Sequence, residues 1–467
     1  KNEVKEAEEK VKEAEEKVAK AEEKLDEKAT QEKACIKAAM QKGLKYCDPC
    51  PLLATLGATW DYCGSEELRQ FMKPGLMTLC ENKGKNADKK MHPIFLALAA
   101  PGQGKSRFLQ EFHNIAEDAV LNATDRKRFF QFSLTLENGQ KYDDAFDSNP
   151  QTLLASRMIW QLVNGPKKQT IRYMGTWATN VSGLPPNFTF DVLRSKVNAE
   201  SICFDDVIGA LQEGEELEEG EWSLSLAVDG LHNLPGSENM SNKETPFYKT
   251  LQKICEFVNR QEGPLVVAAV SATVQVSVEA ALADSPQSRI FIQLPLVDVV
   301  QRGGEPVFNF SGNRLLELME QDMGGHGRAL EELEKEIKGY NEHCWRAEVL
   351  MSAVRVRLHD AYPGAIASSD VIEPVLKAAL SGRWLTPNEN IGGQNVEKMQ
   401  LVRLQYNAAR THRRLLLPFI WIHLAVTQCP SLQHWALMDY TAIGKGPDPG
   451  GHDFEDFLVN FRAKKSL

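Results

Sequence analysis

Apolar residues recur with two different spacings between residues 94 and 300, and each change of spacing predicts a change of element. Helical spacing begins at Lys105 and begins again after Pro150. Strands that alternate with helices predict an α/β fold whose parallel sheet is covered on both faces. Short apolar runs, one of them alternating with polar residues, predict the strands at 94–99, 128–136, 222–229, 264–273 and 289–296.

The first 40 residues follow a seven-residue repeat instead. This repeat predicts a coiled-coil helix, flanked by Glu and Lys, that binds a second copy of the chain or a partner protein. A solvated single helix held by Glu–Lys pairs is the alternative. The repeating positions are Val4, Ala7, Val11, Ala14, Val18, Ala21 and Leu25.

A glycine-rich loop joins the first strand to the first helix. Glycines let backbone N–H groups turn toward phosphates, and the helix N-terminus adds partial positive charge. A strand, such a loop and a Lys-Ser pair opening a helix are typical of the phosphate-binding loop (P-loop) of nucleoside triphosphatases, although Ala99 stands where that motif has its first glycine. We expect ATP or another nucleoside triphosphate to contact Pro101, Gly102, Gln103, Gly104, Lys105, Ser106 and Arg107.

Two residues of this loop have distinct expected tasks. Lys105 is expected to reach the β- and γ-phosphates, and the Ser106 hydroxyl is expected to bind Mg²⁺. The alternative is a glycine-rich turn in which the Lys-Ser pair is accidental.

Polar residues follow the later strands, where a parallel sheet places its functional groups. Asp229 ends a buried strand and is expected to hold Mg²⁺ through a water molecule. The glutamate that usually follows it and activates water is replaced by Gly230, so hydrolysis is expected to be weak. Glu137, after a neighbouring strand, is the best alternative carboxylate, although its place before Asn138-Gly139 equally suits a turn. His232 is a further candidate for orienting water.

The end of the 264–273 strand carries Ser271 and Thr273. In ATPases related to the AAA class, a polar residue at this position senses the γ-phosphate, and small polar residues that only cap a strand are the alternative. Later in the chain, a Gly-Gly-His-Gly turn leads to Arg328. In AAA-like and signalling (STAND-like) NTPases such a turn places a lid arginine against the nucleotide, where it stabilises developing charge. A solvent-facing arginine at a helix start is the alternative.

Composition limits the other possibilities. A net charge of −10 argues against a surface that coats nucleic acid, and no apolar run is long enough to span a membrane. Nine cysteines without a regular framework favour a reducing, intracellular compartment. Structural zinc is a weaker alternative to free thiols for the four cysteines Cys47, Cys50, Cys63 and Cys80. The chain begins with Lys1 and has no secretory leader, so we expect a piece of a longer protein.

These patterns divide the chain into five segments. The C-terminal segment has a basic cluster at 410–414, for which we consider a nucleic-acid contact, a helix face or part of an ion-pair network. By analogy alone, we expect three tandem helices in this part of the chain to form a winged-helix-like unit. The segments are a coiled-coil helix at 1–40, a helical cysteine-containing segment and linker at 41–87, a P-loop NTPase core at 88–300, a helical lid at 301–365 and a mostly helical C-terminal domain at 366–467.

Four of these features together resemble the NTPase module of Crinkler and retrotransposon-hot-spot proteins. They are the P-loop after His92-Pro93, the stretch 134–139, the helix that starts at Asn149 and contains Arg157, and the turn at 324–330. The resemblance covers about 88–340 and reaches the end through Phe454-Glu455. It implies an NTPase in a nuclear or effector setting. Family members typically carry a nuclease-like domain after this module, and no metal site of that kind follows before Leu467.

Two classes of function follow from the sequence. One is an NTP-driven switch or weak ATPase, favoured by the intact pair of Lys105 and Asp229. The other is an interaction or scaffold protein with a degenerate nucleotide site, which the missing glutamate after Asp229 favours.

Overall fold

The computed structural model divides the chain into two compact units. One unit comprises Lys1–Cys50, Asp125–Leu224 and Gly263–Leu265, and the other comprises Pro51–Thr124, Ser225–Glu262 and Val266–Leu467. The repeating positions of the predicted coiled coil, Val4 to Leu25, and Phe454-Glu455 lie outside the described residues. The structure describes residues 35–41, 43–53, 55–137, 139–164, 188–237, 242–273, 278, 282, 286–295, 297, 299–310, 314–339, 347–362, 369–386, 389–396, 403–407 and 411–428.

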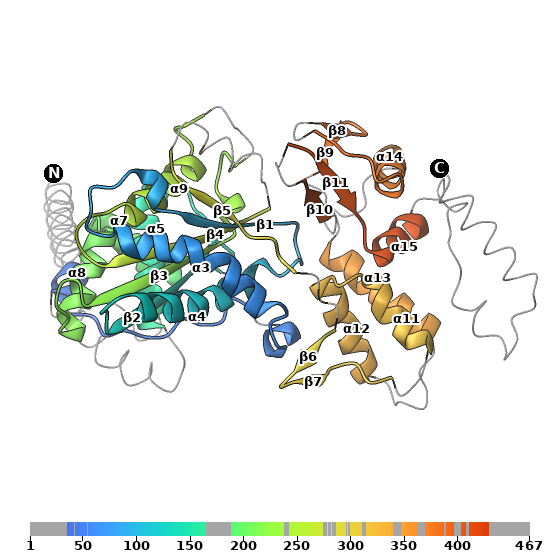
Figure 1. Cartoon of the computed structure of the whole chain (residues 1–467), viewed down its shortest axis with the longest axis horizontal. Coiled ribbons are helices and arrows are strands. Elements are labelled where there is room, and N and C mark those ends of the chain that lie inside the picture. The colour runs from blue at the N-terminus through green and yellow to red at the C-terminus, as the bar shows by residue number, and fades with distance from the viewer. Residues whose placement is uncertain are drawn as a thin grey trace, which may run out of the picture. The chain divides into compact units, whose positions relative to one another are not determined.

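A five-stranded sheet confirms the predicted α/β class (Figure 1). Its order is β2-β3-β4-β1-β5, and β1 runs parallel to both β4 and β5. Every residue of β3 and β4 is buried, as is typical of strands that are covered on both faces. The fifth strand is shorter than predicted. The strands are β1 (Ile94–Leu98), β2 (Arg128–Thr135), β3 (Trp222–Asp229), β4 (Leu265–Ala272) and β5 (Arg289–Phe291).

The first unit contains β2 and four described helices, α2 (Cys35–Met40), α5 (Pro150–Val163), α7 (Phe190–Ala199) and α8 (Phe204–Glu215). The predicted helix after Asn149 is confirmed, because the Asn149 side chain accepts a hydrogen bond from the Gln151 N–H and Pro150 occupies the first turn. The acidic run at 213–221 begins inside α8, whose last three residues it supplies.

Arg157 on α5 fixes the chain that follows β2. Its fully buried guanidinium donates to the Thr135 carbonyl at 3.1 Å and to the Gln140 carbonyl at 2.6 Å, and it pairs with buried Asp147 at 3.2 Å. A buried charge is tolerated when such partners satisfy it. Because Thr135 and Gln140 flank Glu137, this arginine sets the path of the turn that carries Glu137.

The second unit contains β1, β4 and β5 with the helices α3 (Ser65–Asn82), α4 (Lys105–Ala123) and α9 (Pro246–Val258). The segment 41–87 was predicted to be helical. This is right for α3, but the described part of 43–53 has no helix, and only the short 3₁₀ turn η1 (Leu56–Thr59) precedes α3. The low apolar periodicity around Pro49 and Pro51 does not sustain a helix there.

The segment predicted as a lid, 301–365, contains the helices α11 (Arg314–Asp322), α12 (Gly327–Gly339) and α13 (Ala347–Ala361), which pack together (Figure 1). A small hairpin of β6 (Gln301–Arg302) and β7 (Glu305–Pro306) precedes them, which the sequence did not predict. Its turn is Gly303-Gly304, and both glycines have a positive φ.

The C-terminal segment is more mixed than the mostly helical domain that was predicted. Four short strands lie between its two described helices, and Gly392-Gly393, both at positive φ, close the hairpin of β8 and β9. Leu415 and Trp421 share one buried core with Leu330 and Val354 of α12 and α13, which joins this segment to those helices. The elements are α14 (Ser369–Leu380), β8 (Asn390–Ile391), β9 (Gln394–Asn395), β10 (Arg403–Tyr406), β11 (Arg413–Leu416) and α15 (Phe419–Gln428).

Candidate functional site

The glycine loop, residues 99–104, connects β1 to α4 at the carboxyl end of the sheet. Gly102 and Gly104 have φ values of 78° and 83°, which side chains other than glycine rarely adopt. Ala99 keeps the strand pairing, since its N–H donates to the Ala272 carbonyl at 3.2 Å. Alanine replaces the glycine of the motif here without strain, because Ala99 does not have a positive φ: the non-glycine residues that do, in the described part of the chain, are Ser201 and Glu216.

Lys105 is the first residue of α4 and is 9% exposed. Its ammonium donates to the carbonyls of Ala99 at 2.9 Å and of Ala100 at 3.1 Å, so the side chain folds back across the loop. No side chain caps the α4 N-terminus at Gly104. A buried cation therefore lies beside a helix N-terminus, an arrangement that attracts anions.

Asp229, at the end of β3, lies in a network of hydroxyl groups. Its carboxylate accepts hydrogen bonds from the Ser106 hydroxyl at 2.7 Å and from the Ser271 hydroxyl. The Ser271 oxygen in turn accepts from the Gly230 N–H at 3.0 Å. The structure thus brings together Ser106, Asp229 and Ser271, which the sequence placed on three separate elements. Asp229 is 3% exposed, so these bonds replace most of the water that its charge requires.

Arg107, the last of the predicted loop residues, contacts the segment around Trp60 in this structure. Its guanidinium donates to the Trp60 carbonyl at 3.0 Å and lies 5.8 Å from the centre of the Tyr62 ring. The Trp60 indole N–H donates to Glu334 of α12 at 3.0 Å. Trp60 therefore connects α4 to α12.

The Gly-Gly-His-Gly turn before α12 contacts the glycine loop through His326. The His326 Nε2 lies 3.3 Å from the Pro101 carbonyl, and its Nδ1 accepts from the Ala329 N–H at 3.3 Å. A Cβ added to Gly102 would lie 2.4 Å from both the His326 ring and the Tyr362 hydroxyl. Gly102 is thus required by packing as well as by its backbone conformation.

Arg328, the predicted nucleotide-facing arginine, opens α12 and pairs with Glu331 at 2.9 Å. Glu331 also accepts from the Thr55 hydroxyl and the Gly57 N–H. The residue of this turn with a described bond to the glycine loop is His326, which sequence reasoning missed. Its position directly after two glycines was the sequence feature that could have indicated this contact.

The two candidates for orienting water have different surroundings. Glu137 follows β2, and its carbonyl accepts from the Gln140 N–H at 2.9 Å, as expected of a turn residue. His232 lies in η3 (Leu231–Asn233), after Asp229. Burial lowers the pKa of His232 to about 4, and the positive charge of Lys105 adds to the shift, so this imidazole is neutral at pH 7.

Structural zinc is not supported where the structure describes the chain, because no three His, Cys, Asp or Glu side chains there are grouped to hold a metal. Cys50 and Cys63 instead donate to the carbonyls of Asn164 and Val299.

The described helices include none that is long and apolar enough to cross a bilayer.

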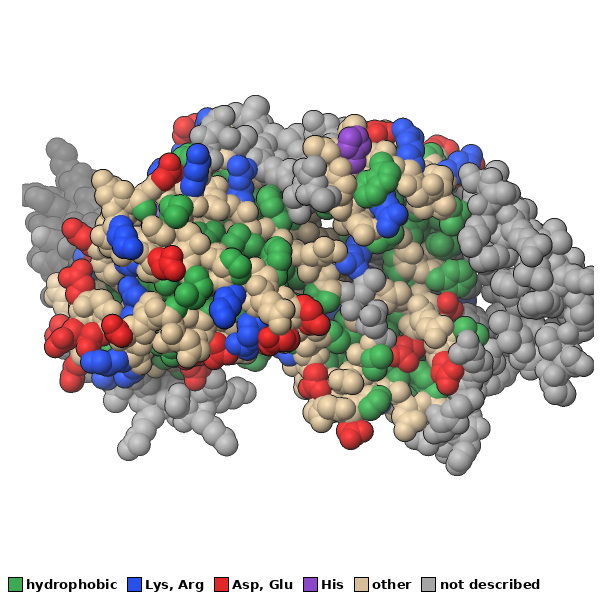
Figure 2. Space-filling view, in the orientation of Figure 1, with side chains coloured by type: hydrophobic (Ala, Val, Ile, Leu, Met, Phe, Trp, Pro, Cys, Tyr) green, Lys and Arg blue, Asp and Glu red, His purple; other side chains and the backbone are tan. Residues whose placement is uncertain are grey.

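Two residues of the basic cluster, Arg413 and Arg414, lie in the strand β11, so this part of the cluster is not a helix face. Arg413 is buried, and Arg414 donates to Gln405 at 2.7 Å and lies over the Trp384 ring. Lys and Arg are interspersed with Asp and Glu on the face in Figure 2.

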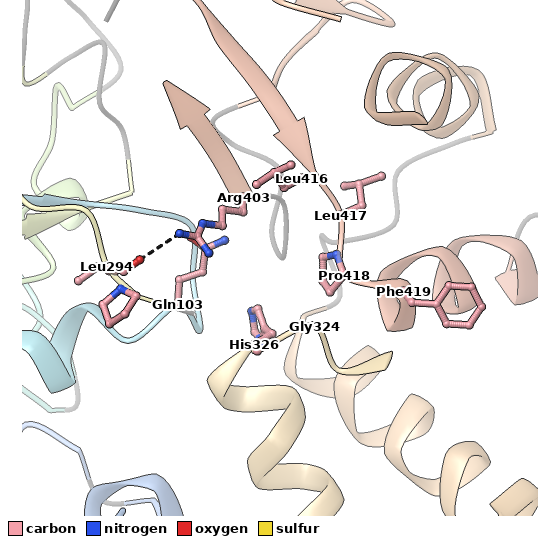
Figure 3. A pocket seen from close by; sticks show the side chains of 11 residues that line it. Gln103, Leu294, Gly324, His326, Arg403, Leu416, Leu417, Pro418 and Phe419 are labelled. Atoms are coloured by element: carbon pink, nitrogen blue, oxygen red, sulfur yellow. Dashed lines mark hydrogen bonds between the residues drawn. The ribbon is translucent and has the colours of Figure 1, made fainter. Parts of the chain in front are cut away.

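A cavity of about 300 Å³ lies beside the glycine loop (Figure 3). Its polar side chains are Gln103, His326 and Arg403, and the Arg403 guanidinium donates to the Leu294 carbonyl at 3.1 Å. Sequence reasoning did not single out Arg403, because nothing in the chain order associates β10 with the loop. The other lining residues are Leu294, Pro295, Gly324, Gly325, Leu416, Leu417, Pro418 and Phe419.

No family model matches the chain. Over 368 residues the chain is 29% identical to Crinkler effector protein 108 of Phytophthora sojae, a match that covers 75% of this chain and 41% of the relative. This similarity supports a Crinkler-like family. The chain spans about two-fifths of the length of that curated relative.

Among solved structures, "Structure of Drosophila ORC bound to DNA" is 11% identical and matches 83% of this chain and 90% of that chain, with a TM-score of 0.33. A score this low does not establish a shared fold.

His326 should make stability depend on pH. Burial is the main cause that lowers its pKa to about 4, and the bond to Pro101 opposes the shift. An unfolded histidine titrates near 6.5, so the unfolded chain binds a proton first as the pH falls. We expect the free energy of unfolding to drop by about 1.4 kcal/mol per pH unit from this residue between roughly pH 6.5 and 4.

Urea unfolding at several pH values measures this effect. The His326→Gln variant should show a flatter pH dependence than the parent, while His412→Gln, at an exposed position, should match the parent. Equal slopes in all three proteins would contradict the assignment to His326.

Proposed function

We propose that this chain binds a nucleoside triphosphate, such as ATP, with Mg²⁺, the phosphates lying on the glycine loop. The observation that carries the proposal is the Ser106–Asp229 contact of 2.7 Å next to the buried Lys105. A hydroxyl, a carboxylate and an ammonium meet beside an uncapped helix N-terminus, which suits a metal-bound polyphosphate. Loop residues 101–107 and Ser271 complete the proposed site.

The residues present fit a magnesium ion. Mg²⁺ prefers oxygen ligands at about 2.1 Å in octahedral geometry, so neighbouring ligand oxygens lie about 3 Å apart. The Asp229 carboxylate accepts from the Ser106 hydroxyl at 2.7 Å, so it is also within hydrogen-bond reach of a water molecule bound to the ion next to that hydroxyl. Ser106 would bind the ion directly and Asp229 through water, while the ion would neutralise phosphate charge.

We further propose that occupancy of the loop acts as a switch. His326 and Gly102 are packed together, so phosphates on the loop amides would bias the position of the turn that leads to Arg328. The proposal has three further parts. Arg328 lies against the γ-phosphate when the loop is occupied, and a partner binds through the N-terminal helix. The protein acts in a nuclear or effector setting. The similarity to a Crinkler effector protein supports the setting.

Lys105 provides the direct test of binding. The Lys105→Met variant keeps most of the buried aliphatic chain but has no charge for the phosphates, so Mg-ATP affinity should fall at least a hundredfold. Calorimetry measures the affinity, and thermal melting should show a folded protein.

Lys83→Met is the matched control, since the Lys83 ammonium also donates to two carbonyls, those of Arg260 and Glu262, away from the loop. Unchanged Mg-ATP affinity in a folded Lys105→Met protein would contradict the proposal that the loop binds phosphates.

Asp229 provides the test of the metal. In the Asp229→Asn variant the loop amides and Lys105 still hold phosphates, but the water shell of the metal loses its charged acceptor. We expect ATP affinity without Mg²⁺ to be nearly unchanged and the gain from adding Mg²⁺ to shrink about tenfold. A gain as large as that of the parent would show that Asp229 does not serve the metal.

Turnover should be slow. Gly230 stands where a water-activating acid is expected, and a positioned water is needed for in-line attack. Phosphate release should be far below the enzyme median of about 10 per second. Glu137→Gln and His232→Ala test the two remaining candidates. Fast release that neither substitution slows would place the base elsewhere.

A further inference from the structure

We propose that His113 and Ser225 are positioning residues, which keep the start of α4 in register with the end of β3. This inference rests on the proposed function of the glycine loop. It names the pair of side chains that holds Ser106 opposite Asp229, about two helical turns away from the proposed magnesium site.

The contact between α4 and β3 contains two polar pairs. The Ser106 hydroxyl donates to Asp229 at 2.7 Å, and the His113 Nδ1 lies 2.6 Å from the Ser225 hydroxyl oxygen. The helix residues are about 10 Å apart along α4, and the strand residues are about 13 Å apart along β3. Two contacts so far apart fix both the sliding and the rotation of the helix against the strand.

The sequence of β3 prepares one face for this contact. Successive side chains of a strand point to opposite faces, so Ser225 and Asp229 share a face. That face has small or polar side chains, which let the helix approach closely, and the opposite face is large and apolar. The first face carries Ser223, Ser225, Ala227 and Asp229, and the second carries Trp222, Leu224, Leu226 and Val228.

The pair of His113 and Ser225 is buried in the core. His113 is 2% exposed and Ser225 is 0% exposed. Burial lowers the pKa of His113 to about 3, so the ring is neutral at pH 7. A hydroxyl both donates and accepts, so it can bond to Nδ1 in either tautomer of the neutral ring. Such a pair contributes little more net stability than apolar groups of the same shape, but it imposes a direction that apolar packing lacks.

The pair of Ser106 and Asp229 is less suited to keep this register by itself. In the proposed function Ser106 binds Mg²⁺ and Asp229 accepts from water on the ion, so both side chains are shared with the ligand. His113 and Ser225 are buried away from water and have no such competitor. Their contact can therefore persist whether or not the nucleotide is bound.

Calorimetry of ATP binding with and without Mg²⁺ tests the inference. In the Ser225→Ala variant, ATP affinity without Mg²⁺ should be nearly unchanged, because the glycine loop and Lys105 are continuous with α4. The gain from adding Mg²⁺ should shrink about fivefold, the effect of one lost hydrogen bond, because Asp229 on β3 is no longer held opposite Ser106.

Two substitutions of His113 separate positioning from packing. His113→Phe keeps a ring in the core but has no nitrogen to bond with Ser225. His113→Asn is smaller but retains a polar atom close to the place of Nδ1. We expect the gain from Mg²⁺ to shrink about fivefold in His113→Phe and to stay within about twofold of the parent in His113→Asn. Packing alone would favour Phe over Asn.

Ser223→Ala is the matched control. Ser223 lies on the same face of the same strand and is also 0% exposed, but its hydroxyl has no hydrogen-bond partner among the described residues. Its removal should leave the gain from Mg²⁺ unchanged. Thermal melting shows which variants fold, and Ser225→Ala compared with Ser223→Ala decides the question if the His113 variants do not.

A gain from Mg²⁺ within about twofold of the parent in both Ser225→Ala and His113→Phe would overturn this inference and leave the phosphate loop and Asp229 in their proposed roles. An equal loss in His113→Phe and His113→Asn would also overturn it, since the bond to Ser225 would then not be what matters. A parent that does not bind ATP, or gains nothing from Mg²⁺, would refute the proposed function and this inference together.

Discussion

The burial of Asp229 is the constraint on which the candidate site depends. A carboxylate that is 3% exposed must be compensated, and here two serine hydroxyls bond to it from α4 and β4. These bonds hold the start of α4, the end of β3 and the end of β4 in register. Lys105, the first residue of α4, adds a second buried formal charge, and backbone carbonyls of the glycine loop accept hydrogen bonds from it. The site is therefore assembled by local charge compensation at the carboxyl end of parallel strands.

Sequence patterns predicted most of this arrangement because it depends on local rules. Continuous apolar runs predicted β1, β3 and β4, and a lysine-serine pair after glycines predicted the start of α4. Parallel pairing then brings strand ends to one edge, which is why Ser106, Asp229 and Ser271 could be expected near each other.

The parts that were not predicted depend on contacts between distant segments. The bonds of His326 to the loop and of Arg403 to Leu294 join residues more than a hundred positions apart, and no periodicity encodes such pairs. The short hairpins of the C-terminal segment are set by glycine turns and strands of two to four residues, too short for alternation to be recognised. The burial of four glutamates on α12 depends on such contacts too, because bonds to Thr55, Trp60, Lys335 and Arg357 compensate them.

Trp60 has a mechanical consequence. Its carbonyl is bonded to Arg107 of α4 and its indole to Glu334 of α12, so one residue links the two helices through both its backbone and its side chain. Any rotation of α12 against α4 must break one of these bonds or carry the segment around Trp60 with it. Breaking one costs about 1–3 kcal/mol, a charged group being involved in each. That free energy is small compared with the value of about 8 kcal/mol with which a micromolar ligand binds a protein. Trp60 therefore stabilises one arrangement of the two helices by an amount that the binding of a ligand is large enough to overcome.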